Sequence, residues 1–338
     1  MTDGAAWTAG RNNAITDVPG IRVGHWTDRK AATGCTVVLC ESARAVAVDT
    51  RGGAPGTRET DVLGGPNIVR NAHAVVLSGG SAFGLASADG VMRWCEEHSI
   101  GFPTRQRRIP IVSAAVLYDL GVGSALAAPN ADAGYAAAKR AKAGRVAEGN
   151  VGAGTGASVA KLLGPDRALK GGLGSASVVG PRGLIVGAIV ATNAGGLVFD
   201  PGTGELVAGP RADGGGFVSL AETLERRTAA MDAMLENTTL VCIATNASLA
   251  HHQLQRIAIH AHDGLARVIV PAHTFSDGDT VFAIGMGGVE PTDDDPLLVG
   301  MLAMRAVEQA LLRSVRLAGS VPGFPSAADW RGRPASRG

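Results

Sequence analysis

Aromatic side chains are scarce in this sequence of 338 residues, where they make up 4% of the chain. A hydrophobic core must therefore be built from Ala, Val, Leu and Ile, and a chain of this length can bury enough of them to fold without disulfide bonds. The four cysteines form no CxxC pair, and Cys35, Cys40 and Cys242 lie in apolar, strand-like segments. This pattern is typical of buried, reduced thiols in a cytoplasmic protein.

An excess of charge of one sign is also lacking, because the formal net charge is +1. The short basic cluster at residues 105–108 is typical of a solvated loop, and no stripe of aromatic and basic residues accompanies it. The near-zero net charge argues against a nucleic-acid partner. No apolar run is long enough to span a membrane, and the first 13 residues contain no apolar signal core. We therefore expect a cytoplasmic protein that has no membrane partner.

Glycine, in contrast, is abundant at 48 residues and follows no collagen-like repeat, which indicates tight turns and close approaches between backbones. Pairs of β-branched runs alternate with amphipathic segments, and parallel crossovers do not dominate. A single α+β domain built as a sandwich of two sheets covered by helices is expected. The Arg-rich residues 326–338 are expected to form a loose tail. Strands are predicted at residues 34–41, 45–51, 72–80, 109–120, on both sides of a turn at 181–183, at 238–247 and at 279–287, and helices at 81–98 with Ser81 as N-cap, 132–144, 248–267 and 296–317.

The most informative tripeptide is Asn237-Thr238-Thr239, where a polar segment ends and a β-branched strand begins. If the bond before Thr238 is cut, its hydroxyl can act as a nucleophile. The freed α-amine, with a reference pKa of about 8, can accept the hydroxyl proton. The chain would cut itself by attack of Thr238 on the carbonyl of Asn237, followed by hydrolysis of the ester. The tripeptide is also a glycosylation sequon, and Asn-Thr pairs before strands are common without this chemistry.

Two carboxylates, Asp277 and Asp279, flank a glycine at the entrance of a buried strand. They could hold a hydroxyl and an ammonium group, with one pKa raised by repulsion, or they could be solvated turn residues. Asn193 ends another strand, where its amide could donate to an oxyanion or cap a turn. Lys161 follows a glycine-rich loop and would need a carboxylate partner if buried. That loop matches neither the GxxxxGK[ST] phosphate motif nor the dinucleotide spacing.

Histidine spacing offers no metal site. His260 and His262 would point apart on a helix, because ligands belong at i and i+4, and no spacing unites them with the other histidines. The GxSxG motif of a Ser-His-Asp hydrolase is absent. We expect neither a metal nor an organic cofactor.

Together these blocks resemble the DmpA-type family, which comprises L-aminopeptidase/D-esterases, β-peptidyl aminopeptidases and the nylon-oligomer endohydrolase NylC. The resemblance covers residues 15–287. It rests on the blocks ITDVPGIRVGHWTD, DTRGGAPGTRETD, LSGGSAFGLASADGVMRW, EGNVGAGTGASVAK, KGGLGSAS, ENTTL, ATNA, HDGLAR and PAHTFSDGDTVFA.

This resemblance implies a four-layer αββα sandwich similar to that of N-terminal-nucleophile hydrolases but differently connected. It also implies self-cleavage into an α chain (1–237) and a β chain (238–338) that stay together, commonly as tetramers of such heterodimers. By position, Thr238 matches the nucleophile, Asp277 and Asp279 match acidic residues beside it, and Lys161, Asn193 and Tyr118 match its other contacts.

The resemblance also suggests roles for these residues. Asn193 would stabilise the oxyanion, Lys161 would place charge near the carboxylates, and Tyr118 would hydrogen-bond the nucleophile or the substrate. The turn that begins at residue 78 would line the pocket with backbone N–H groups, the residues concerned being Ser78, Gly79, Gly80 and Ser81.

The predicted activity is hydrolysis of amide bonds in small peptides or peptide-like oligomers through an acyl-enzyme on Thr238. α-Peptides, β-peptides, D-amino-acid amides or esters and nylon oligomers all remain open as substrates. One alternative is an acyltransferase of the ornithine-acetyltransferase type, which passes the acyl group to an amine. A second is a non-catalytic metabolite-binding protein, which predicts an uncut chain.

Overall fold

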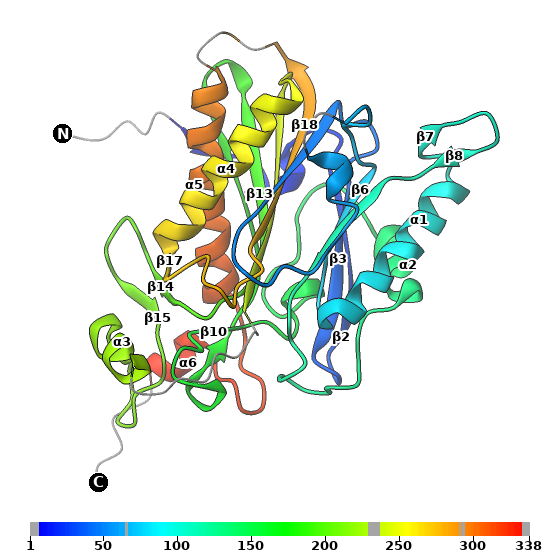
Figure 1. Ribbon diagram of the computed structural model, residues 1–338. Helices are drawn as coiled ribbons and strands as arrows, with labels where there is room; N and C mark the ends of the chain where they lie inside the picture. Colours follow the sequence, from blue (N-terminus) through cyan, green and yellow to red (C-terminus); the bar gives the residue numbers. More distant parts are fainter. Residues whose placement is uncertain (1–6, 65–66, 229–236, 291, 293–294, 333–338) are drawn as a thin grey trace.

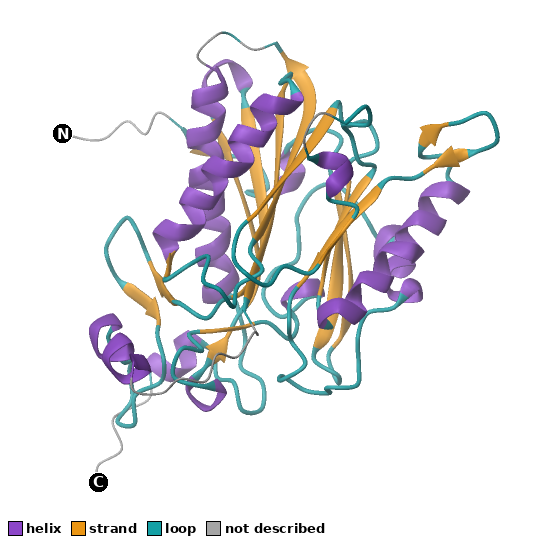
Figure 2. Cartoon of the chain, in the orientation of Figure 1, coloured by secondary structure: helices purple, strands orange, loops and turns teal. Residues whose placement is uncertain are grey.

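The computed structural model describes residues 7–64, 67–228, 237–290, 292 and 295–332. Two β-sheets lie face to face, and a pair of helices covers the outer side of each, so that the layers run helix, sheet, sheet, helix (Figure 1). The predicted αββα sandwich is confirmed. Figure 2 shows the two sheets in orange between the flanking helices in purple.

The first sheet has six strands and carries most of the residues of interest. Its neighbours pair antiparallel except for β16 and β18, which run parallel. The helices α4 (His251–Val268) and α5 (Asp295–Arg316) pack on its outer face. The strand order is β1 (Thr8–Ala9), β12 (Gly172–Val179), β13 (Ile185–Asn193), β16 (Thr238–Ala247), β18 (Thr280–Val289) and β4 (Ala45–Thr50).

The second sheet has five strands, of which β6 and β9 run parallel. Its outer face is covered by α1 (Ser87–Glu97) and α2 (Ala131–Lys139). The strand order is β2 (Arg22–Asp28), β3 (Thr33–Leu39), β6 (Ala74–Ser78), β9 (Val112–Val116) and β5 (Thr57–Arg58).

Three hydrophobic cores separate the four layers, and β16 contributes to two of them. Val241 and Ile243 face the core under α4 and α5, whereas Leu240, Cys242 and Ala244 face the core between the sheets. A strand with both faces covered has a nearly continuous run of apolar residues in its sequence. For this reason the segment TTLVCIATNA could be predicted as a strand. Every residue of β16 is buried.

Glycine in the KGGLGSAS block lets helix α5 approach the sheet closely. A Cβ atom on Gly174 would lie 2.0 Å from the carbonyl oxygen of Ala310, so no larger residue fits without moving the helix. Glycine allows such a close approach because it has no side chain. The high glycine content therefore reflects close packing between layers as well as turns.

Shorter elements complete the fold at the periphery. No helix among the described residues is long and apolar enough to cross a membrane, and none of the four cysteines forms a disulfide. The small strands are β7 (Phe102–Pro103), β8 (Arg108–Ile109), β10 (Ser158–Val159), β11 (Leu169–Lys170), β14 (Leu197–Phe199), β15 (Leu206–Ala208) and β17 (Ile269–Val270), and the short helices are α3 (Leu220–Thr228) and α6 (Ala327–Arg331).

Three predictions about local structure are wrong. Ser81 does not cap a helix, because it adopts a left-handed φ of 53° and opens a 3-10 turn that leads into α1. The helix predicted at residues 132–144 ends at Lys139. The start of the expected tail is ordered, since α6 forms there and the Trp330 indole N–H donates to Gly216 O at 2.7 Å. Residues 333–338 of that tail, and residues 229–236 of the predicted linker, lie outside the described residues.

Candidate active site

The sheet order brings the predicted site residues together around the first residue of β16. Thr238 is the ladder partner of Asn193, the last residue of β13. On the other side, Asn237 forms a parallel bridge with Asp277, just before β18 begins. The ends of three neighbouring strands thus meet at one point, and Thr238 is 5% exposed there.

The peptide bond between Asn237 and Thr238 lies where these three strand ends meet. The Thr238 hydroxyl oxygen lies 2.5 Å from the carbonyl oxygen of Asn237. The backbone N–H of Gly278 donates to that same carbonyl oxygen at 3.1 Å. Attack on this carbonyl would place negative charge on the oxygen, where a fixed N–H donor stabilises it.

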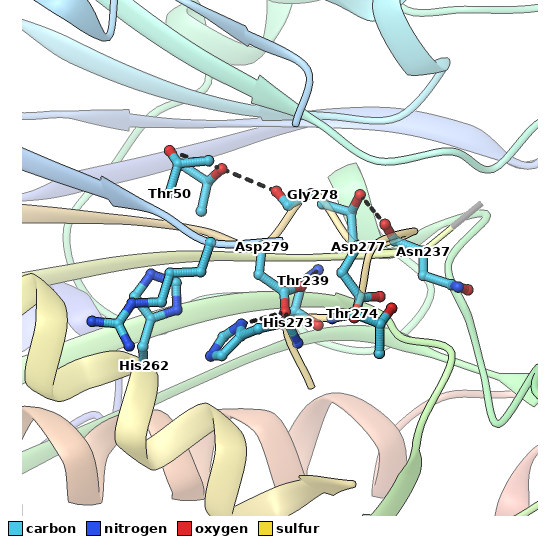
Figure 3. A network of polar contacts seen from close by, with 12 residues as sticks. Thr50, Asn237, Thr239, His262, His273, Thr274, Asp277, Gly278 and Asp279 are labelled. Atoms are coloured by element: carbon cyan, nitrogen blue, oxygen red, sulfur yellow. Dashed lines mark hydrogen bonds and ion pairs between the residues drawn. The ribbon is translucent and has the colours of Figure 1, made fainter. Parts of the chain in front are cut away.

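Asp279 is buried and is held from two sides (Figure 3). Its Oδ1 accepts the backbone N–H of Thr239 at 2.6 Å. Its Oδ2 accepts the backbone N–H of His273 at 3.2 Å and lies 2.8 Å from His273 Nδ1. The carboxylate therefore fixes the backbone at Thr239, directly after Thr238.

Asp277 is the second buried carboxylate. Its Oδ2 accepts the backbone N–H of Thr274 at 2.6 Å. Burial and, next, the nearby charge of Asp279 raise the pKa of Asp277, while the bonds from Thr274 and the charge of Lys161 oppose the rise. Desolvation is the larger cause of the rise, and repulsion between the two carboxylates adds to it.

Lys161, Asn193 and Tyr118 form one connected group. The Lys161 ammonium donates to both Asn193 O and Asn193 Oδ1, each at 3.1 Å. The side-chain amide of Asn193 donates to Tyr118 O at 2.9 Å, and its Oδ1 also accepts the N–H of Ser158 at 3.0 Å. Tyr118 thus joins through its main-chain carbonyl, and the predicted role of its phenol stays a prediction.

The turn after β6 differs from the prediction that its N–H groups line a pocket. Gly79 N–H donates to Gly34 O at 2.9 Å, and Ser81 N–H donates to Leu117 O at 3.0 Å. Gly80 N–H donates to Asp119 Oδ1 at 2.6 Å, and the Ser78 hydroxyl donates to Gly79 O at 3.1 Å. These donors are used to fix the turn itself, so they are not available to a ligand.

Lys170 is a buried cation that the sequence analysis did not identify. Its ammonium donates to three carbonyl oxygens, those of Gly154 at 2.9 Å and of Ala157 and Gly171 at 2.7 Å. Burial lowers the pKa of Lys170 to about 7, and the nearby charge of the buried Asp119 acts in the opposite direction. The side chain holds the glycine-rich loop in the conformation that leads to Ser158 and Lys161.

Replacing Lys170 with methionine should therefore destabilise the protein by about 3 kcal/mol or more, because three buried carbonyl groups lose their donor. Thermal or urea unfolding would measure the loss. Lys30 is exposed, and Lys30→Met is the matched control, for which a change within about 0.5 kcal/mol is expected. Equal stability of both variants would show that the loop does not depend on this ammonium group.

Two histidines near Asp279 were considered in the sequence only as metal ligands and were missed as part of the site. His273 lies six residues before Asp279 and contacts it through both its backbone and its ring. His262, on α4, packs edge-to-face against His273 with ring centroids 4.7 Å apart. The one signal in the sequence is that His273 lies in the same block, PAHTFSDGDTVFA, as the two carboxylates. Within the described ranges, no group of three or more His, Cys, Asp or Glu side chains could hold a metal ion.

Comparison with solved structures defines the class of the fold. An L-aminopeptidase D-Ala-esterase/amidase from Ochrobactrum anthropi, a variant of the Ntn hydrolase fold, matches with a TM-score of 0.72 at 22% identity, covering 95% of this chain and 92% of that chain. A β-aminopeptidase from a Burkholderia species matches with a TM-score of 0.68 at 24% identity, covering 93% and 89%. The chain therefore shares a fold that is a variant of the Ntn hydrolase fold.

The sequence assigns the family. Residues 13–328 match the family model of Peptidase family S58, and the chain belongs to this family of hydrolases. An uncharacterized aminopeptidase of Mycobacterium tuberculosis is 44% identical over 344 aligned positions, covering 94% of this chain and 97% of the relative. A 6-aminohexanoate-oligomer endohydrolase of Kocuria sp. is 33% identical over 292 positions, covering 82% and 76%.

Proposed function

We propose that this protein is a self-processing hydrolase that cuts its own chain between Asn237 and Thr238 and then uses Thr238 as an N-terminal nucleophile on amide bonds. The observation that carries the proposal is the geometry of that bond. The Thr238 hydroxyl lies against the carbonyl group it would attack, and Gly278 N–H donates to the oxygen that would become negative.

Self-cleavage proceeds in two steps. The Thr238 oxygen forms a bond to the carbonyl carbon of Asn237, the carbon–nitrogen bond breaks, and the hydroxyl proton ends on the departing nitrogen. The product is an ester between Asn237 and the Thr238 side chain. Water then hydrolyses this ester, which leaves a carboxylate on Asn237 and a free hydroxyl and α-amine on Thr238.

In turnover, the same oxygen attacks the carbonyl of a substrate amide, and the Thr238 α-amine takes the hydroxyl proton. Once the Asn237 carbonyl has left its place, the N–H of Gly278 becomes available to the oxyanion of a substrate. The side-chain amide of Asn193, which donates to Tyr118 O, would have to direct an N–H to the oxyanion to take part. The leaving amine receives a proton and departs, and water hydrolyses the acyl-enzyme. Lys161 compensates part of the negative charge of Asp277.

The substrates that fit this proposal are amides of small peptides or peptide-like oligomers. The names of the relatives, an aminopeptidase and an endohydrolase of 6-aminohexanoate oligomers, both describe hydrolysis of chains of amino-acid units. A tetramer of cleaved units, which the family resemblance implies, and a cytoplasmic location, which the cysteine usage favours, belong to the same proposal. Candidate amines added to the assay would reveal acyl transfer if the protein were instead an acyltransferase.

The first test is an intact mass of the purified protein under denaturing conditions. We expect two fragments that correspond to residues 1–237 and 238–338 and that separate only after unfolding. A single uncut chain in a well-folded sample would remove the free α-amine on which turnover depends. It would favour the non-catalytic binding protein as the function of this fold.

A further inference from the structure

A chain of buried and partly buried polar groups leads from the candidate active site to the far edge of the first sheet. Asp279 contacts the ring of His273, this ring packs against His262, and His262 Nε2 lies 3.1 Å from the main-chain oxygen and 3.3 Å from the carboxylate of Asp49 on β4. Figure 3 shows His273 between His262 and Asp279. The His262 side chain is fully buried and that of His273 is 19% exposed.

The contacts define which nitrogen of each ring carries the proton. Asp279 Oδ2 is an acceptor, so His273 must donate from Nδ1. The two oxygen atoms of Asp49 near His262 are also acceptors, so His262 donates from Nε2. Burial lowers the pKa of His262 to about 4, with the nearby His273 acting in the same direction and Asp49 and Asp279 opposing it. His262 is therefore a neutral ring at neutral pH.

We propose that His273 is a positioning residue for Asp279, and that His262 holds the ring of His273 in place from helix α4. The inference rests on the proposed function and extends it by two residues. With Nδ1–H on Oδ2, the other oxygen of Asp279 stays on the N–H of Thr239, directly after the nucleophile. Without that donor the carboxylate can turn, and the start of β16 loses a fixed contact.

The titratable and charged groups around this chain come from three elements. Loop residues before β18 supply Asp277 and Asp279, α4 supplies His262, and β4 supplies Asp49, which is paired with Arg51 at 2.8 Å. Asp277 bonds to Thr274 and not to either ring. His273 is therefore the side chain that connects Asp279 to the rest of this network.

A pair of variants separates hydrogen-bond donation from space filling. His273 has a left-handed φ of 56°, a conformation that Asn and Asp tolerate better than other residues with side chains. His273→Asn keeps a donor near the place of Nδ1, whereas His273→Asp has the same shape and presents an acceptor. We expect His273→Asn to retain self-cleavage and kcat within about 10-fold, and His273→Asp to lose about 100-fold or more in both with little change in KM.

The pH profile adds a readout that a purely structural role would not move. When the carboxyl group introduced in His273→Asp takes up a proton, it becomes a donor to Asp279. The loss of self-cleavage and of kcat in His273→Asp should therefore become smaller as the pH falls. The pH profile of His273→Asn should show no such gain at low pH. Equal losses in both variants at every pH, with both folded, would overturn the proposal.

A measurement without turnover keeps this test separate from that of the proposed function. In an uncut Thr238→Val chain, nitrogen-15 NMR of the imidazole rings reports which nitrogen carries the proton. We expect His273 on Nδ1 and His262 on Nε2, and His273 on Nε2 would contradict the inference. If the wild type neither cuts itself nor hydrolyses amides, the proposed function fails, while the tautomers still decide whether His273 donates to Asp279.

Discussion

Replacing Thr238 with valine is expected to leave one uncut chain and to lower amide hydrolysis by roughly 10⁴-fold or more, as the loss of a catalytic nucleophile does in other hydrolases. Valine keeps the shape of threonine and removes the hydroxyl that lies against the Asn237 carbonyl. The chain should still fold, because β16 remains apolar and buried. Intact mass and a panel of peptide and oligomer amides would measure the two effects.

The neighbouring residue provides a matched control. Thr239 is buried, and its hydroxyl oxygen has no hydrogen-bond partner in the described part of the chain. Thr239→Val is the same chemical change one position along the strand, so it should leave cleavage and hydrolysis near the wild-type level. Two fragments from Thr238→Val, or one uncut chain from Thr239→Val, would place the nucleophile elsewhere.

Replacing Gly278 with alanine should slow self-cleavage by about 100-fold or more, since small displacements of reacting groups cost that much. A Cβ atom at this position would lie 2.9 Å from the Thr238 hydroxyl oxygen and 2.7 Å from Ala54 O. The added methyl group therefore pushes against the nucleophile on one side and against backbone on the other. The fraction of cut chain at set times after refolding would measure the effect.

A glycine in open surroundings serves as the control for this substitution. No atom lies within 4 Å of a Cβ added to Gly214, and its backbone is not left-handed. Gly214→Ala should therefore cut at the wild-type rate. If the Gly278→Ala protein cut itself as fast as the wild type, the loop at Ala54 would have moved to make room for the methyl group. The Thr238 hydroxyl would then not be held by the backbone around it.

Much of the fold could be predicted from the sequence, because buried strands and amphipathic helices leave a direct pattern. The strand at 238–247 was predicted with the bounds that the structure has, and the last helix, predicted at 296–317, spans Asp295–Arg316. Thr238 could be selected as the candidate nucleophile by its place at the start of that strand. That Asn193 and Asp277 lie beside it depends on the order β13, β16, β18, which no local spacing reveals and which only the resemblance implied.

What could not be predicted depends on contacts between distant segments. His262 meets Asp49, which lies 213 residues earlier in the chain. Lys170 is buried because three carbonyl groups surround its ammonium, a setting that its apolar neighbours in the sequence do not indicate. The turn at Ser81 was predicted as a helix cap from its residue type, but the left-handed backbone there depends on how Asp119 and Leu117 hold the turn.

The central position of β16 has a consequence for how the two fragments would exist. Its hydrogen-bonding partners are β13, which precedes the proposed cut, and β18, which follows it. The bond proposed to be cut meets Gly278 only after these strands have assembled, so we expect a chain to be cut only once it has folded. Because the cut is not reversed by unfolding, each cut molecule must have reached the native state at least once. The ratio of fragments to full-length chain in a cell extract would count the molecules that had folded at least once, including those that later unfolded.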